Sequence, residues 1–193
     1  MTQIISFTKF KKKNNYPDHR FGSCILHHND LWIHIPKNAS STIKTMVHGS
    51  EVDGQRAMVN FVDDPLLLKK NVIAITREPI ERFITGYLTC ISRGPITKIL
   101  KFRDNPFDNL VKFIDDLIIN GPADEHVERQ SWFLPNKVDK FIKMENLKFK
   151  ELHNKNNHPL KHRLHNFLIE SPDIVYNLKN FYQKDFVLYN QSS

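Results

Sequence analysis

The fold of this chain is decided by the stretch VIAITREPIERFITGYL, residues 72–88. Its first four residues are apolar and favour a buried β-strand. Pro79 suits the first turn of an α-helix. Apolar residues then recur at helical spacing and make one face: Ile80, Phe83, Ile84, Tyr87, Leu88 and Ile91. The stretch therefore predicts a strand, a tight turn and an amphipathic helix.

The same order of elements occurs once before in the chain. Residues 31–35 form a short apolar run that predicts a strand, and Pro36 ends it. A short helix is expected from about Ser41 to Gly49, a residue suited to a helix end, and it would bury Ile43, Met46 and Val47. Two strand–turn–helix units in the first half favour an α/β fold with a mostly parallel sheet.

The second half adds two helices and a strand to this expectation. A helix is predicted over residues 106–120, with Asn105 as its N-cap and Gly121-Pro122 as its end. Residues 138–143 predict a third strand. Ser171-Pro172-Asp173 starts another helix, whose inward residues are expected to be Ile174, Leu178, Phe181 and Tyr182.

Composition indicates one cytoplasmic domain with an anionic partner. The 193 residues predict a single domain, with residues 1–25 as an amino-terminal extension and a core over about 30–190. No apolar run approaches the roughly 20 residues of a transmembrane helix, and two cysteines suggest a reducing compartment. The net charge of +7 favours an anion. The charge alone does not choose among nucleic acid, an acidic membrane and a small polyanion.

The turn after the first predicted strand carries residues suited to an anion. It reads PKNASST, residues 36–42. A helix amino terminus exposes unpaired N–H groups and a partial positive charge, Lys37 adds a point charge, and the small Ala39 and Ser40 let the backbone approach a phosphate. The turn lacks the glycines of the G-x-x-x-x-G-K-[ST] loop. It predicts a metal-free phosphate site; the alternative is a serine-capped helix with a solvated lysine.

The turn after the second strand carries an arginine at the strand's carboxyl end, where α/β sheets place ligand groups. The fork of Arg77 can donate two hydrogen bonds to a terminal phosphate. Thr85, two turns into the helix, is close enough to help hold the same anion. The alternative is that Arg77, Glu78 and Arg82 form surface ion pairs.

Together, these turns resemble the signatures by which the sulfotransferase superfamily binds 3′-phosphoadenosine 5′-phosphosulfate (PAPS). Residues 35–42 resemble its 5′-phosphosulfate loop, and residues 77–87 resemble its 3′-phosphate motif R-x-P-x-x-R-x-x-S-x-Y, with Thr85 in place of serine. The resemblance is closest to the carbohydrate sulfotransferase branch (family 2 type). DEHVERQ, residues 124–130, resembles D-x-H-W-x-P-Q, from which Val127 and Arg129 depart. Residues 139–147 resemble a strand with a Glu-x-Leu element, and YQKDF, residues 182–186, resembles Y-x-x-D-F.

The resemblance implies a three-layer P-loop-type fold and transfer of a sulfuryl group from PAPS to a hydroxyl, expected on a carbohydrate. Lys37 would stabilise the bridging oxygen of the leaving group. The first turn would hold the 5′-phosphosulfate through Lys37, Asn38, Ala39, Ser40, Ser41 and Thr42. Arg77 and Thr85 would hold the 3′-phosphate. No metal is expected, because protein cations neutralise the leaving group.

The acceptor hydroxyl needs a general base, and His126 is the first candidate. The alternative for His126 is a residue that orders its loop, and His48 and Glu51 are further candidates for the base. Four histidines crowd one tract at His153, His158, His162 and His165. We expect this tract to form a basic surface that contacts the donor or an acidic acceptor, and not a metal site.

Two other functions remain open at this point. One is a P-loop kinase or nucleotide-binding protein, which would need a magnesium-holding acid and a glycine-rich loop. The other is a non-enzymatic basic module that binds nucleic acid. We expect no nucleic-acid partner, because the basic residues are scattered. The sequence does not indicate an oligomeric state.

Overall fold

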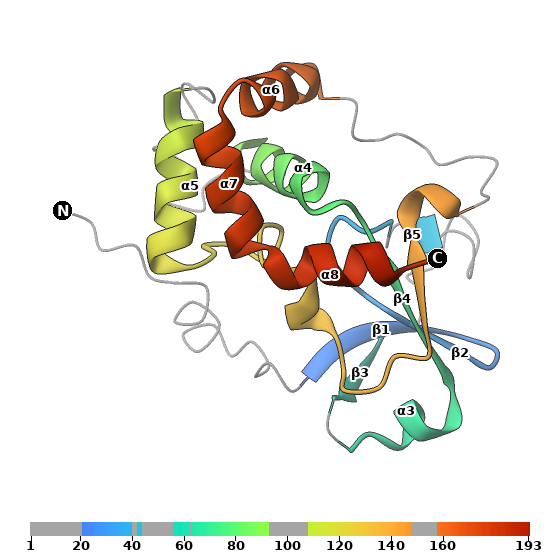
Figure 1. Ribbon diagram of the computed structural model, residues 1–193. Helices are drawn as coiled ribbons and strands as arrows, with labels where there is room; N and C mark the ends of the chain where they lie inside the picture. Colours follow the sequence, from blue (N-terminus) through green and yellow to red (C-terminus); the bar gives the residue numbers. More distant parts are fainter. Residues whose placement is uncertain (1–20, 40–41, 44–55, 62, 93–107, 148–157) are drawn as a thin grey trace. The chain divides into compact units, whose positions relative to one another are not determined.

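The computed structural model describes residues 21–39, 42–43, 56–61, 63–92, 108–147 and 158–193 (Figure 1). These residues form two compact units, and each is described by itself. The sheet unit contains residues 21–39, 42–43, 56–61, 63–78, 129–147 and 184–193. The helical unit contains residues 79–92, 108–128 and 158–183.

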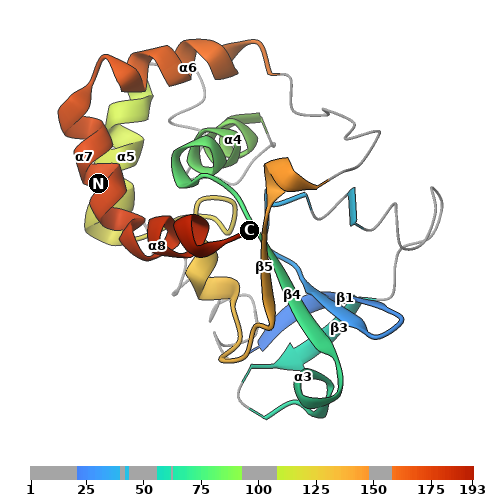
Figure 2. The ribbon, with the colours of Figure 1, turned by 45° about the vertical axis from the view of Figure 1, so that its right-hand side comes forward.

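The sheet unit is built on one open five-stranded mixed sheet with the order β3-β1-β2-β4-β5 (Figure 2). The strands are β1 (Phe21–His27), β2 (Asp30–Ile33), β3 (Arg56–Asn60), β4 (Asn71–Thr76) and β5 (Lys140–Lys143). β2 pairs in parallel with β4, and β4 with β5. β1 pairs antiparallel with both β2 and β3. The protein is therefore an α/β protein whose sheet is only partly parallel.

The predicted strands are confirmed as β2, β4 and β5, with small shifts of their ends. The prediction of a mostly parallel sheet holds only for these three strands, because β1 and β3 add two antiparallel pairings. β1 begins at Phe21, so part of the segment expected to be an amino-terminal extension belongs to the sheet. Gly22 allows the ring of Phe61 to pack closely there, since a Cβ atom would lie 2.0 Å from that ring.

Apolar side chains from the strands fill the core of the sheet unit. β4 lies between β2 and β5 and is buried from its second residue to its last, which explains its continuous apolar sequence. One cluster gathers residues of β1, β2 and β4 with Phe133, and a second gathers Ile25, Ile43, Ile75 and Leu147. The short elements α3 (Pro65–Lys69), η2 (Gln130–Phe133) and η3 (Met144–Asn146), and α8 (Gln183–Gln191) from Lys184 onward, complete the unit.

The helical unit contains α4 (Pro79–Ser92), α5 (Asp108–Asn120), α6 (Leu160–Ile169) and α7 (Pro172–Phe181). α7 packs against α4, α5 and α6, and it runs beside α5 in Figures 1 and 2. An aromatic cluster joins them, in which the ring centroids of Tyr87 and Phe113 lie 5.0 Å apart. Burial, and to a smaller extent Cys90, raise the pKa of Tyr87 above its ordinary value. This tyrosine of the 3′-phosphate motif therefore serves the core.

Three of the helices expected from the sequence are confirmed as α4, α5 and α7. Gly121 ends α5 with a φ of 77°, the left-handed conformation that glycine adopts most easily. Of the short helix after the first turn, Thr42 and Ile43 are helical and Ile43 is buried. Its expected continuation through Met46, Val47 and Gly49 lies outside the described residues. No helix in the described part of the chain is long and apolar enough to cross a membrane.

Candidate active site

The two predicted anion-binding turns follow neighbouring parallel strands, so they lie at the same edge of the sheet. In the first turn, residues 36–39, Lys37 has a φ of 69° and Ala39 a φ of 57°. Residues with side chains rarely adopt this left-handed backbone, which costs about 1–3 kcal/mol and clusters at ligand sites. The N–H of Ile43 then donates to the carbonyl oxygen of Ala39 at 3.0 Å and starts the helix. Turns of this kind present backbone N–H groups to anions.

Arg77 brings the second turn against the first. One nitrogen of its guanidinium donates a hydrogen bond to the carbonyl oxygen of Lys37 at 3.1 Å. The Arg77 side chain is buried, as is Arg82 in the helical unit, so neither arginine lies at the surface as the alternative interpretation expected. The turns that carry Lys37 and Arg77 are therefore in contact. These residues are the two cations expected to hold opposite ends of the donor.

The buried side-chain amides of Asn38 and Gln130 form a hydrogen-bond network that holds both turns in place. Asn38, only 2% exposed, donates through Nδ2 to the carbonyl oxygen of Ile75 at 2.6 Å and to Oε1 of Gln130 at 2.5 Å. Gln130 also binds both backbone groups of Arg77, at 2.9 Å and 2.8 Å. Asn38 was expected to contact the ligand, and its observed contacts hold the turn in place.

Two residues of this network were not assigned from the sequence. One is Gln130, at the end of the DEHVERQ segment, and the other is Asp185, in the YQKDF segment. It is fully buried, and it accepts hydrogen bonds from the backbone N–H groups of Gln130 at 2.6 Å and Ser131 at 2.9 Å. The two segments were recognised separately by resemblance, and the sheet unit joins them through this carboxylate.

The remaining residues of the first turn are described only in part. Thr42 is half-buried at the start of the helical residues. Ser40 and Ser41 lie outside the described residues, and so do His48 and Glu51, the alternative general bases.

Thr85 belongs to the helical unit, whereas Arg77 belongs to the sheet unit. Its hydroxyl is buried on α4 and donates to the backbone carbonyl oxygen of Glu81 at 2.9 Å. This bond back to the preceding turn is common for threonine in helices. A phosphate contact would need the hydroxyl proton to turn away from Glu81, so the role of Thr85 at the 3′-phosphate stays a prediction.

His126 lies in a loop, residues 124–128, that is held within the helical unit from three directions. Arg82 donates to the carbonyl oxygen of Glu128 at 2.5 Å, and the Tyr182 hydroxyl donates to that of Val127 at 2.6 Å. Gly86 of α4 lies so close that a Cβ atom there would be 2.1 Å from the carbonyl oxygen of His126. Arg82, Gly86 and Tyr182 therefore fix the path of this histidine loop.

Asp124 orients the ring of His126. One carboxylate oxygen accepts from the backbone N–H of His126 at 2.8 Å and lies 2.5 Å from its Nδ1. A neutral imidazole that donates from Nδ1 carries its lone pair on Nε2, the arrangement of a general base. The same contacts order the loop. The structure thus gives His126 the loop-ordering role, and its role as a base stays a prediction.

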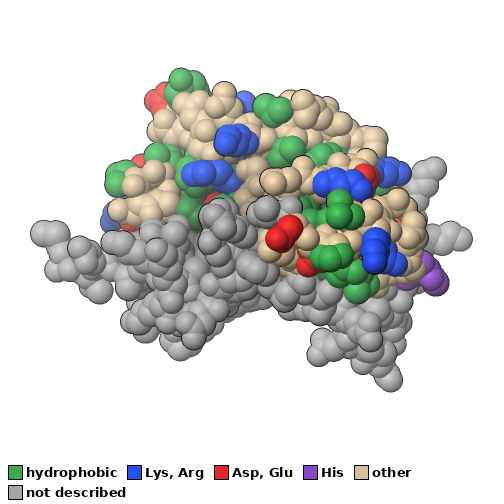
Figure 3. Space-filling view, turned by 90° about the horizontal axis from the view of Figure 1, so that it is seen from below, with side chains coloured by type: hydrophobic (Ala, Val, Ile, Leu, Met, Phe, Trp, Pro, Cys, Tyr) green, Lys and Arg blue, Asp and Glu red, His purple; other side chains and the backbone are tan. Residues whose placement is uncertain are grey.

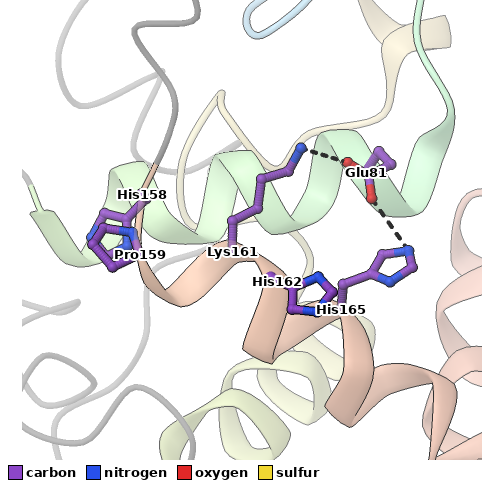
Figure 4. A pocket seen from close by; sticks show the side chains of 6 residues that line it. All are labelled: Glu81, His158, Pro159, Lys161, His162 and His165. Carbon is purple, nitrogen blue, oxygen red and sulfur yellow. Dashed lines mark ion pairs between the residues drawn. The ribbon is translucent and has the colours of Figure 1, made fainter.

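The histidine tract lines a separate pocket of about 640 Å³ in the helical unit (Figure 4). Glu81 of α4 forms ion pairs there with Lys161 at 2.8 Å and with His165 at 3.3 Å. The other lining residues are His158, Pro159 and His162. Within the described ranges, no three histidine, cysteine or acidic side chains are arranged to hold a metal ion. His153 lies outside those ranges.

Comparison of the chain with protein-family models, with curated proteins and with solved structures finds no match. The function is therefore inferred from the chain's own residues. On the face drawn in Figure 3, the described lysine and arginine side chains are interspersed with hydrophobic and acidic side chains.

Proposed function

We propose that this protein is a PAPS-dependent sulfotransferase with a P-loop-type fold. The observation that carries the proposal is the hydrogen bond between the Arg77 guanidinium and the Lys37 carbonyl. It joins the turns that resemble the 5′-phosphosulfate loop and the 3′-phosphate motif, at the carboxyl ends of β2 and β4. A bisphosphorylated nucleoside carries an anionic group at each end, and Lys37 and Arg77 are the cations proposed to bind them.

The residues of the sheet unit suit this donor. The turn over residues 36–39 holds Lys37 and Ala39 in a strained conformation, and their backbone N–H groups are the candidate donors to an anion. Arg77 is a buried cation with a planar fork, suited to a terminal phosphate. Both groups are fixed before a ligand arrives, so little ordering is required on binding.

Sulfuryl transfer resembles phosphoryl transfer, in which positioning and electrostatic stabilisation supply most of the rate enhancement. Lys37 stabilises negative charge on the bridging oxygen as the bond to sulfur breaks. Arg77 anchors the 3′-phosphate and selects the donor over ordinary adenine nucleotides. His126, oriented by Asp124, takes the proton of the attacking hydroxyl on Nε2. The acceptor is a hydroxyl, with carbohydrate as the expected class, and the expected compartment is the cytoplasm.

The proposal is tested by transfer of labelled sulfate from PAPS to a mixture of host glycans and small metabolites. The wild-type protein should label at least one acceptor. Lys37→Ala should lower the turnover number by about 100-fold or more, the loss expected when one stabilising group is removed from a developing charge. Arg77→Ala should chiefly raise the KM for PAPS.

Lys184→Ala, which removes an exposed lysine of the sheet unit, is the matched control and should leave turnover unchanged. Unchanged turnover in Lys37→Ala would refute the mechanism. Stabilisation of the wild-type protein by ATP or by an oligonucleotide, but not by adenosine 3′,5′-bisphosphate, would favour a kinase or a nucleic-acid-binding module instead.

A further inference from the structure

The side chain of Gln130 binds both anion-binding turns of the sheet unit. Its Oε1 accepts from Asn38 of the first turn at 2.5 Å and from the backbone N–H of Arg77 at 2.9 Å. Its Nε2 donates to the carbonyl oxygen of Arg77 at 2.8 Å. The side chain is 1% exposed, so these bonds form away from water, where their loss leaves buried groups unpaired.

Gln130 is itself held by a residue far away in the chain. It is the first residue of η2, and its backbone N–H donates to the buried carboxylate of Asp185 on α8. The next N–H, that of Ser131, donates to the other oxygen of the same carboxylate. A helix start leaves such N–H groups without partners in the helix, so Asp185 caps η2 and fixes the base of the Gln130 side chain.

An amide is the side chain best suited to this position. It has an acceptor and a donor, which match the N–H and carbonyl of Arg77 as a second backbone would. It is also neutral. A carboxylate would place a negative charge between two sites proposed to bind anions, and an apolar side chain would remove the hydrogen bonds that Gln130 makes with the Arg77 backbone and the Asn38 amide.

We propose that Gln130, held by Asp185, is a positioning residue that sets the spacing between the Lys37 turn and Arg77. It thereby favours a ligand that carries two anionic groups on one nucleoside. This inference rests on the proposed function for the identity of the ligand. A ligand with two phosphates gains from fixed spacing, because its second contact forms within the same complex. A ligand with one phosphate contacts one turn only, so the spacing between the turns does not raise its affinity.

The test is to titrate the full chain calorimetrically with adenosine 3′,5′-bisphosphate, adenosine 5′-monophosphate and adenosine 3′-monophosphate. Gln130→Met keeps the length of the side chain and removes all its hydrogen bonds. It should weaken binding of the bisphosphate by about 10- to 100-fold, as a loosened positioning group does. Binding of each monophosphate should change by less than about 3-fold.

Leu67→Ala is the matched control, since Leu67 is buried in the sheet unit and makes no contact used in either turn. It lowers stability and should leave the ratio of bisphosphate to monophosphate affinity unchanged. Asp185→Asn retains Gln130 and should lower the same ratio to a smaller extent. It is the second variant if Gln130→Met does not fold.

The two proposals fail in different ways. Wild-type protein that does not bind the bisphosphate refutes the proposed function and this inference with it. Wild-type binding that Gln130→Met leaves unchanged, or weakens equally for all three nucleotides, overturns the inference alone, because a merely structural glutamine would give that result. The same change of ratio in Leu67→Ala would also overturn it.

Discussion

Gly86→Ala should destabilise the helical unit, although the same change stabilises most helices. A Cβ atom at position 86 would lie 2.1 Å from the carbonyl oxygen and 2.8 Å from the carbonyl carbon of His126, whereas ordinary contact begins at 3.4 Å. To reach ordinary contact, α4 and the histidine loop would have to separate by about 1.3 Å, the difference between 3.4 Å and 2.1 Å. The loop cannot yield easily, because Arg82 and Tyr182 bind its carbonyl groups.

Two opposing effects set the magnitude for Gly86→Ala. Replacing glycine by alanine in a helix interior gains about 1 kcal/mol. Overpacking a filled site costs about 1–3 kcal/mol, and the upper end applies here because the obstacle is backbone. We expect a net loss of about 1–2 kcal/mol in the free energy of unfolding, since overpacking exceeds the propensity gain. For a chain of this size that corresponds to a fall in Tm of about 2–8 °C.

Urea denaturation of wild type and variant measures this loss. Gly121 provides the matched control, because a Cβ atom there meets nothing within 4 Å, but its φ is +77°. Gly121→Ala should therefore destabilise through backbone strain, and Gly121→Asn should recover part of the loss, since asparagine tolerates this conformation. Gly86→Asn should recover nothing. A Gly86→Ala protein as stable as wild type, or more stable, would refute the reasoning.

Three further predictions follow from single contacts. The hydrogen bond from the backbone N–H of Val72 holds the pKa of Asp139 below its usual value, and Lys137 contributes to a smaller extent. The charged carboxylate therefore stabilises the fold at every pH above the ordinary carboxyl pKa. This stabilisation is lost as the pH falls through the lowered pKa of the folded protein. Asp139→Asn should thus lower the urea midpoint at neutral pH but not in strong acid, and a pH-independent difference would contradict this. Tyr182→Phe removes the hydroxyl that donates to the buried Val127 carbonyl and should cost about 1–3 kcal/mol of unfolding free energy in the same assay; an unchanged free energy of unfolding would contradict this. Asp124→Asn should lower the turnover number for sulfate transfer by about 10-fold or more, because His126 would lose the carboxylate that orients its ring, with little change in the KM for PAPS. An unchanged turnover number would exclude His126 as an oriented base.

Local patterns were sufficient to predict the elements that carry the site. The apolar run of β4, Pro79 and the spacing of apolar residues in α4 agree with one another, so each supports the same assignment. β1 and β3 were missed. The sequence of β1, FGSCILH, mixes polar, small and apolar residues, and its strand conformation depends on antiparallel partners that a local pattern does not reveal.

The sequence indicated Lys37 and Arg77 as candidate site residues, but not the contacts that connect the candidate site. The resemblance indicated Lys37 and Arg77, and the parallel pairing of β2 and β4 explains why they meet. The contact between Gln130 and Asp185 joins residues 55 positions apart through one side chain and one backbone group. No periodicity signals such a contact, because it arises from packing of the whole sheet unit.

The central claim is that the Lys37 turn and Arg77 bind opposite ends of one nucleotide, and a crystal structure of the wild-type chain with adenosine 3′,5′-bisphosphate tests it most directly. We predict the 5′-phosphate against the backbone N–H groups of Lys37 and Ala39, and the 3′-phosphate within hydrogen-bonding distance of the Arg77 guanidinium. A nucleotide bound elsewhere, or one that contacts only one of the two turns, would contradict the account.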